Sequence, residues 1–263
     1  MGENTTDAVD GRHLRVAFVP GVTPDKWFRT WRERMPDVDI VAVPLEDERE
    51  QRLVLTDSRA DMSLVRLPIA DDGLHVIPLY VENPVVVAPK GHEITAADAV
   101  DIADLAGEHL LQHPDAVAEW RDIALEVADG TRIDVPSMTP RDAIELVGSG
   151  AGIVIVPLSV ARQFDRKDVV RRPVTGVAET RVALCWPVDA DGELVEQFIG
   201  VVRGRSARST RSLGSVEAEQ EAAKQRAAKK KAAARRSTEQ ARERKHADRA
   251  ARRKAGGRKR GRR

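Results

Sequence analysis

Three short apolar runs separated by helix-like segments constrain the fold of this chain most strongly. The runs are LRVAFV at Leu14–Val19, VDIVAV at Val38–Val43 and DMSLV at Asp61–Val65, and each has the length of a buried strand. Thr23-Pro24 opens a segment with apolar residues at helical spacing, and a second helix is expected over Asp47–Thr56. The β-α-β-α-β order predicts a parallel sheet covered by helices.

A second set of elements follows, so the predicted fold class is α/β with two Rossmann-like lobes. Expected strands are His75–Leu79, Pro84–Ala88, Leu110-Leu111, Arg132–Pro136, Gly152–Val156 and Thr180–Trp186, and expected helices are Asp115–Ala128, Thr139–Gly148 and Leu194–Val202. We predict one crossing between the lobes near Val85–Lys90 and a return at Trp186-Pro187. Two lobes joined by two strands enclose a cleft, and clefts between lobes bind small ligands.

The net charge of +1 conceals an acidic body joined to a basic tail. Arg203–Arg263 holds 23 Lys and Arg against 6 Asp and Glu, a net charge of +17, whereas residues 1–202 carry a net charge of −16. Residues 206–263 form a basic low-complexity C-terminal tail without an apolar stripe, so we expect this tail to be helical or disordered. Residues 1–11 are polar and are expected to be disordered.

Clusters of basic side chains in the tail predict non-specific nucleic-acid binding, because Lys and Arg neutralise phosphates. No aromatic residue lies among these clusters, so base stacking is not expected. Alternatively, the tail is a solubilising segment or folds back on the acidic body. The residues predicted to contact nucleic acid are Lys229, Lys230, Lys231, Arg235, Arg236, Arg252, Arg253, Arg258, Lys259 and Arg260.

Motifs of catalysis and membrane insertion are absent from the sequence. There is no Gly-x-Ser-x-Gly elbow, no Walker-type loop and no His-Glu-x-x-His, so we predict neither enzyme activity nor a cofactor. There is also no apolar run of about 18 residues and no signal peptide. These absences predict a cytoplasmic protein that does not enter a membrane.

Three local features resemble functional motifs but have structural interpretations. Gly148–Gly152 leaves a helix and enters a strand, which is typical of a helix C-cap and tight turn, not of a phosphate-binding loop. His109 and His113 have i,i+4 spacing, but Pro114 blocks a helix there, so no metal site is predicted. Cys185 lies in the apolar run VALCW and is expected to be a buried, inert thiol.

The body resembles the effector-binding domain of LysR-type transcriptional regulators over Arg12–Arg205. The matching segments are LRVAFVPG, MPDVDIVAV, ADMSLVRLP, VIPLYVENPVVVAPKGHEI and IELVGSGAGIVIVPLSVAR. The resemblance implies a type 2 periplasmic-binding-protein-like fold, a small-molecule effector and a homodimer. It places one lobe at about 12–88 and 187–205 and the other at about 89–186. Family members usually begin with a winged helix-turn-helix, whereas only about a dozen residues precede the first expected strand here.

Two groups of residues are predicted to line the cleft where helices begin. Gly21 and Thr23 follow the first strand, and Thr23 is also expected to cap the first helix. Ser137, Met138 and Thr139 occupy the equivalent place in the second lobe. Hydroxyl groups and exposed helix N–H groups at such positions bind ligands in open α/β sheets.

Two charged residues complete the predicted site. Family members often have Ser or Thr at the start of the second helix, where this chain has Leu45-Glu46-Asp47-Glu48. A carboxylate there repels carboxylate ligands. Asp47 therefore favours a neutral or cationic ligand, or a vestigial cleft. Arg66 follows the third strand, where it is expected either to pair with an anionic ligand or with Asp47, or to be an ordinary surface arginine.

The sequence supports one function best and leaves a second open. The favoured hypothesis is a regulatory, small-molecule-sensing domain with a basic tail for nucleic acid or another anionic partner. The alternative is a nucleic-acid-associated protein whose body is a dimerisation module without a ligand. Related two-lobed folds host enzymes, but fold alone is weak support for catalysis.

Overall fold

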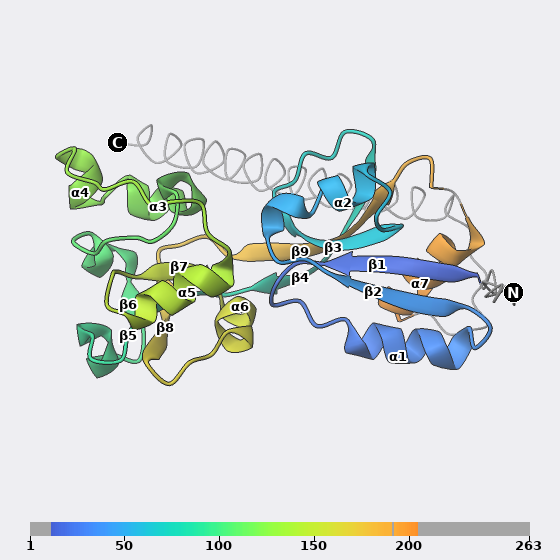
Figure 1. Cartoon of the computed structure of the whole chain (residues 1–263), viewed down its shortest axis with the longest axis horizontal. Helices are drawn as coiled ribbons and strands as arrows, with labels where there is room; N and C mark the ends of the chain where they lie inside the picture. The colour runs from blue at the N-terminus through green and yellow to red at the C-terminus, as the bar shows by residue number, and fades with distance from the viewer. Residues whose placement is uncertain (1–11, 191, 205–263) are drawn as a thin grey trace, which may run out of the picture. The chain divides into compact units, whose positions relative to one another are not determined.

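The structure of the chain is a computed structural model that describes residues 12–190 and 192–204, and these residues contain two β-sheets (Figure 1). The predicted disordered N-terminus, the tail and all ten predicted nucleic-acid-binding residues lie outside the described residues. None of the described helices has both the length and the apolar character that a membrane-spanning helix needs.

The first sheet has the strand order β2-β1-β3-β9-β4. Strand β1 pairs in parallel with β2 on one side and with β3 on the other, as the β-α-β-α-β pattern predicts. The last two strands run antiparallel, β9 beside β3 and β4 beside β9. The bounds are β1 His13–Phe18, β2 Asp39–Pro44, β3 Met62–Leu67, β4 Leu74–Glu82 and β9 Thr180–Pro187.

Helices α1 (Asp25–Arg34) and α7 (Glu193–Val202) pack together against this sheet, and the short α2 (Leu53–Thr56) contacts β3 and β9. In Figure 1, α1 and α2 lie on opposite sides of the sheet. The Trp31 and Phe198 rings meet at 5.8 Å, and Trp31 Nε1 donates a hydrogen bond to Val38 O over 2.9 Å. Burial of each such side chain contributes about 1.5–3 kcal/mol. This sheet and its helices are called the first lobe below.

The second sheet has the order β6-β8-β5-β7 and, with its helices, forms the second lobe. Successive residues of β5 face opposite sides. Val86 therefore packs with Trp120 on one side, and Val85 packs with Ile144 on the other. The strands are β5 Pro84–Pro89, β6 Val100–Asp101, β7 Val154–Pro157 and β8 Val169–Thr175; the helices are η2 Glu93–Ala96, η3 Ile102–Leu105, η4 Pro114–Val117, α3 Ala118–Arg121, α4 Leu125–Ala128, α5 Pro140–Gly148 and α6 Leu158–Gln163.

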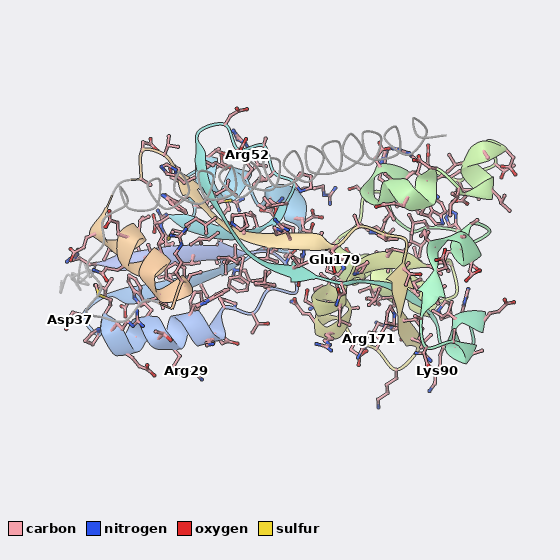
Figure 2. The ribbon with its side chains drawn as sticks, turned by 180° about the vertical axis from the view of Figure 1, so that it is seen from behind. Arg29, Asp37, Arg52, Lys90, Arg171 and Glu179 are labelled. Atoms are coloured by element: carbon pink, nitrogen blue, oxygen red, sulfur yellow. The ribbon has the colours of Figure 1, made fainter. Side chains whose placement is uncertain are left out.

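Both crossings between the lobes lie earlier in the chain than predicted. β4 belongs to the first sheet and β5 to the second, so the first crossing is at Asn83 and not at Val85–Lys90. The return lies between β8 and β9, in residues 176–179, and not at Trp186-Pro187; Figure 2 labels Glu179 in this return. The apolar pattern misplaced these crossings because both β5 and β9 continue as buried strands in the sheets that they enter.

Two predicted helices are broken into shorter pieces. In the predicted helix Asp47–Thr56, the structure has a 3₁₀ turn, η1 (Glu48–Glu50), followed by α2. The Gln51 side chain exchanges hydrogen bonds with the backbone N–H and C=O of Arg66, which ties this point to β3. In the predicted helix Asp115–Ala128, the Leu125 N–H donates to Ala106 O, so the helical hydrogen-bond pattern stops before α4.

Two predicted strands are absent, and five short elements were not predicted. Residues 132–136 have no strand geometry, and Leu110 makes only an isolated bridge with Ile153. The unpredicted elements are β6, β8, α6, η2 and η3. The glycine run behaves as predicted: α5 ends at Gly148, and a Cβ on Gly152 would lie 2.3 Å from His109 O, so only glycine fits there.

Candidate ligand-binding cleft

A cleft of about 400 Å³ lies between the two lobes, within the volume range of small-molecule sites. The first lobe contributes η1 and the end of β3, and the second contributes β7 and the segment that leads into α5. Most of the lining side chains are apolar. They are four prolines, three alanines and the larger residues Leu111, Val117, Val135, Met138, Ile155, Val156, Val160 and Val177. The polar and charged lining residues are Asp47, Glu48, Arg49, Arg66, Gln112, His113, Ser137, Thr139 and Thr180.

Five of the seven predicted ligand-binding residues line this cleft. They are Asp47, Arg66, Ser137, Met138 and Thr139. Thr139 also caps α5, because its Oγ1 accepts a hydrogen bond from Asp142 N over 3.2 Å and donates one to Asp142 Oδ2 over 2.8 Å. Thr139 is thus the N-cap of α5, the helix that the sequence predicts to begin there, and its contact with a ligand stays a prediction.

Gly21 and Thr23 do not line the cleft. Thr23 is exposed, and α1 begins after Pro24 without a side-chain cap, so the predicted cap is wrong. Proline at the cap position leaves no side-chain acceptor for the first helical N–H groups. Gly21 instead contacts α6 of the second lobe: its N–H donates to Gln163 Oε1, and an added Cβ would lie 2.6 Å from Ser159 Oγ. Its φ of +87° also favours glycine.

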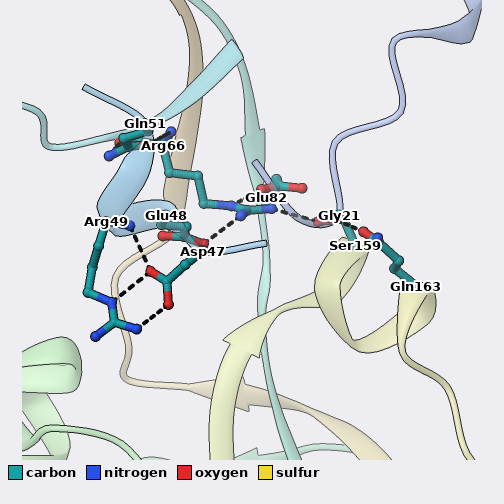
Figure 3. Close-up of polar contacts among 9 residues, drawn as sticks. All are labelled: Gly21, Asp47, Glu48, Arg49, Gln51, Arg66, Glu82, Ser159 and Gln163. Atoms are coloured by element: carbon teal, nitrogen blue, oxygen red, sulfur yellow. Dashed lines mark hydrogen bonds and ion pairs between the residues drawn. The ribbon is translucent and has the colours of Figure 1, made fainter. Parts of the chain in front are cut away.

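Arg66 is buried, with 2% of the residue exposed, so its interpretation as a surface arginine is wrong. It does not pair with Asp47 either. Its Nε donates to Glu82 Oε2 over 2.8 Å and its Nη1 to Glu48 Oε1 over 2.5 Å. Its Nη2 reaches Ser159 Oγ in the second lobe at 3.1 Å (Figure 3). A buried guanidinium needs such partners, because an unpaired charge in the interior costs several kcal/mol.

Asp47 is paired with Arg49, so its charge is largely neutralised within the cleft wall (Figure 3). Burial opposes ionisation of Asp47, but hydrogen bonds from the Arg49 side chain and backbone outweigh it and lower the pKa of the carboxyl below its ordinary value. Arg49 Nη1 also donates to Ser137 Oγ in the second lobe. Arg66 was the partner predicted for Asp47, whereas the structure pairs Asp47 with Arg49, two residues away.

Arg132 holds the irregular segment that carries Ser137, Met138 and Thr139. Its Nη2 donates to Leu110 O and Gln112 O over 2.8 and 2.7 Å, and its Nη1 donates to Glu126. The guanidinium also lies over the Trp120 ring, 5.3 Å from its centroid. Side-chain bonds therefore replace the sheet pairing that the sequence predicted here. The pattern RIDVP gave no signal of this role.

The histidine pair and the cysteine that resemble functional motifs in the sequence have structural explanations. His109 Nδ1 lies 2.7 Å from Glu126 Oε2, and no cluster of three or more metal-ligating side chains occurs within residues 12–190 and 192–204. Cys185 is buried, which raises the pKa of its thiol to about 12, with a smaller contribution from Asp71. A thiol with this pKa is protonated near neutral pH and is a poor nucleophile.

Two sheets with two crossings and a cleft between them define a two-lobed ligand-binding domain of the periplasmic-binding-protein type. The family model described as "LysR substrate binding domain" matches residues 8–207, about three quarters of the chain. The chain therefore belongs to the LysR substrate-binding domain family, and the resemblance seen in the sequence is confirmed.

Relatives and solved structures agree with this assignment. The chain is 30% identical over 128 residues to the HTH-type transcriptional regulator ShiR of Corynebacterium glutamicum, covering 47% of this chain and 43% of ShiR. It is 24% identical over 213 residues to the Hca operon transcriptional activator HcaR of Escherichia coli, covering 76% of this chain and 70% of HcaR. The chain thus spans less than half of ShiR. Both relatives are transcriptional regulators.

Two solved domains illustrate the shared fold. The BenM effector binding domain with its effector benzoate superposes with a TM-score of 0.56 at 20% identity, covering 73% of this chain and 91% of that one. The reduced OxyR regulatory domain from Pseudomonas aeruginosa gives a TM-score of 0.56 at 18% identity, covering 76% and 99%. At these identities the likeness concerns the fold alone.

Proposed function

We propose that this chain is the effector-sensing part of a cytoplasmic transcriptional regulator and that it binds a small molecule in the cleft between its lobes without transforming it. The observation that carries the proposal is the cleft itself, which receives polar groups from both lobes around an apolar interior. Because both lobes would contact the ligand, binding favours one relative arrangement of the lobes over others. That change is the signal passed to a partner, and a second copy of the chain is the partner that we propose.

The test is a thermal-shift screen of the full chain against small metabolites. A ligand that binds only the folded state raises the melting temperature in a concentration-dependent manner. Substituting Ser137 and Met138, which line the cleft, should abolish the shift, whereas substituting the exposed Thr23 should not. If no compound stabilises the protein, or if stabilisation survives the cleft substitutions, the sensing role is wrong.

We further propose that the basic tail binds nucleic acid through phosphate contacts. Its support is the net charge of +17 on residues 203–263, which suits a partner with closely spaced phosphates. The test compares the full chain with a variant that ends at Ser206, by titration against a labelled duplex DNA and an RNA over a salt series. Binding that requires the tail and falls steeply with salt supports the proposal.

The same two experiments separate the competing function, a nucleic-acid-associated protein that uses its body only to dimerise. That function predicts tail-dependent binding to nucleic acid, no stabilising ligand, and a dimer in sedimentation analysis. If neither nucleic acid binds the full chain, the tail is a protein-docking or solubilising segment, and the sensing role is decided by the ligand screen alone.

A further inference from the structure

The carboxylates in these ion pairs at the cleft outnumber the guanidinium groups. Asp47 and Arg49 form a neutral pair in its wall. Arg66, in contrast, faces two carboxylates, Glu82 and Glu48, at 2.8 and 2.5 Å. One guanidinium between two carboxylates leaves a net charge of −1 at the end of β3, where the cleft meets the buried interior.

Every nitrogen of the two guanidinium groups in the cleft already donates to a protein acceptor, although each Nη atom keeps a second N–H. Arg66 uses Nε, Nη1 and Nη2 on Glu82, Glu48 and Ser159. Arg49 uses Nε and Nη2 on Asp47, and its Nη1 on Ser137. A ligand carboxylate would share these guanidinium groups with carboxylates that are already bound to them, and it would add a further negative charge beside Glu48.

Glu48 is the carboxylate that can accept a further hydrogen bond from a ligand. Its side chain lines the cleft and is 38% exposed, so the cleft reaches it, whereas Glu82 is 6% exposed behind Arg66. Only Oε1 of Glu48 accepts a hydrogen bond within the described part of the chain, and Oε2 is free to accept one from a ligand. Figure 3 shows Glu48 beside Asp47, with the Arg66 side chain running past both toward Glu82.

We propose that the cleft selects a small organic cation, an amine with an apolar body, and that Glu48 is the residue that recognises its ammonium group. The ammonium would donate to Glu48 Oε2 and restore neutrality beside Arg66, while the aliphatic and proline side chains of the second lobe cover the apolar body. Asp47, which the sequence singled out, has no such role because Arg49 already neutralises it. This inference rests on the proposed sensing function and specifies the class of ligand.

The test uses probes that share a carbon skeleton and differ only in charge. Benzylamine, benzamide and benzoate form one set, and hexylamine, hexanamide and hexanoate form a second. Affinity for the full chain is measured by calorimetry and by thermal shift at constant ionic strength. We expect the amine of each set to bind at least about tenfold more tightly than its carboxylate, the size of effect given by one hydrogen bond to a charged group.

Substitutions at position 48 separate charge from shape. Glu48→Gln should lower amine affinity about tenfold and remove the preference over the carboxylate, whereas Glu48→Asp should keep the preference. Glu46→Gln, at an exposed residue outside the cleft lining, is the matched control and should change nothing. Circular dichroism confirms that each variant is folded.

The outcomes distinguish this inference from the function on which it rests. If the carboxylates or amides bind as tightly as the amines, or if Glu48→Gln leaves the preference intact, the proposed ligand class is wrong and the sensing function is unaffected. If no probe binds even at millimolar concentration, the ligand class is overturned and the sensing function loses support as well.

Discussion

Arg66 and Glu82 form a buried ion pair in which Nε of the guanidinium lies 2.8 Å from Oε2 of the carboxylate. Arg66 ends the buried part of β3, and Glu82 is the last residue of β4, directly before the crossing into the second lobe. The same guanidinium reaches Ser159 of the second lobe and lines the cleft. This pair therefore links the cleft wall to the point where the chain passes between lobes.

Removing one partner of this ion pair should lower the free energy of unfolding. Arg66→Met leaves Glu82 buried without its partner, and we expect the free energy of unfolding to fall by about 3–5 kcal/mol. Glu82→Gln should also destabilise. Urea unfolding of both single variants and of the double variant measures the coupling, and the double variant should lose less than the sum of the two single losses. Strictly additive losses would contradict a direct interaction.

Gly21→Ala should disturb the contact between the lobes. The new Cβ would lie 2.6 Å from Ser159 Oγ and 2.7 Å from Val160 N, and the φ of +87° adds backbone strain. Gly73→Ala is the matched control, because Gly73 has a φ of +75° but nothing lies within 4 Å of its added Cβ. Both variants should lose the roughly 1–2 kcal/mol of a left-handed alanine. Only Gly21→Ala should lose more and change the small-angle X-ray scattering profile; equal behaviour of the two would refute the close contact.

Arg132→Met should release the segment that carries Ser137–Thr139. The variant loses the hydrogen bonds to Leu110 O and Gln112 O and the ion pair with Glu126. We expect faster amide hydrogen exchange across residues 133–139 and little change in β1 and β3, because local anchoring sets the opening free energy of such a segment. Arg121→Met removes an arginine whose ion pairs are with the exposed Asp115 and Asp122, and it should leave exchange at 133–139 unchanged.

The stability of the protein should fall with rising pH in the alkaline range. Burial raises the pKa of the Cys185 thiol from 9.0 to about 12, and burial together with Glu82 raises that of the Tyr80 phenol from 10.0 to about 12. Between pH 9 and 12 the unfolded chain therefore binds fewer protons than the folded chain, so these groups lower the free energy of unfolding as pH rises. Near neutral pH, well below the ordinary pKa of 9.0 of a thiol, both groups are protonated in both states and contribute no slope.

Urea unfolding between pH 8 and 10.5 measures this dependence. The Cys185→Ala and Tyr80→Phe variants should each show a shallower decrease than the parent chain, whatever their absolute stability. An unchanged slope in both variants would mean that neither group has a raised pKa in the folded state. As an independent check, the native thiol should resist a thiol reagent at pH 8 and react once urea unfolds the chain.

Much of the site could be located from the sequence, but its chemistry could not. Thr139-Pro140 predicted both the start of α5 and a position beside the cleft, because a helix cap has a local signature. Thr23-Pro24 has the same local pattern, yet Thr23 neither caps α1 nor lines the cleft. Identical dipeptides differ here because the surrounding fold, not the dipeptide, sets where the helix begins.

The two-lobed α/β architecture could be predicted from strand and helix periodicity and from the order of the elements, which are properties of short segments. The family followed from the resemblance of five such segments to LysR-type domains. Which charges meet depends on the tertiary structure instead. Arg66 is buried between Glu48 and Glu82, which are 18 and 16 positions away along the chain, and Arg132 replaces a predicted strand by bonding to backbone carbonyls 20 and 22 positions away. Ion pairs depend on distance in space and on burial, and neither quantity is carried by a local sequence pattern.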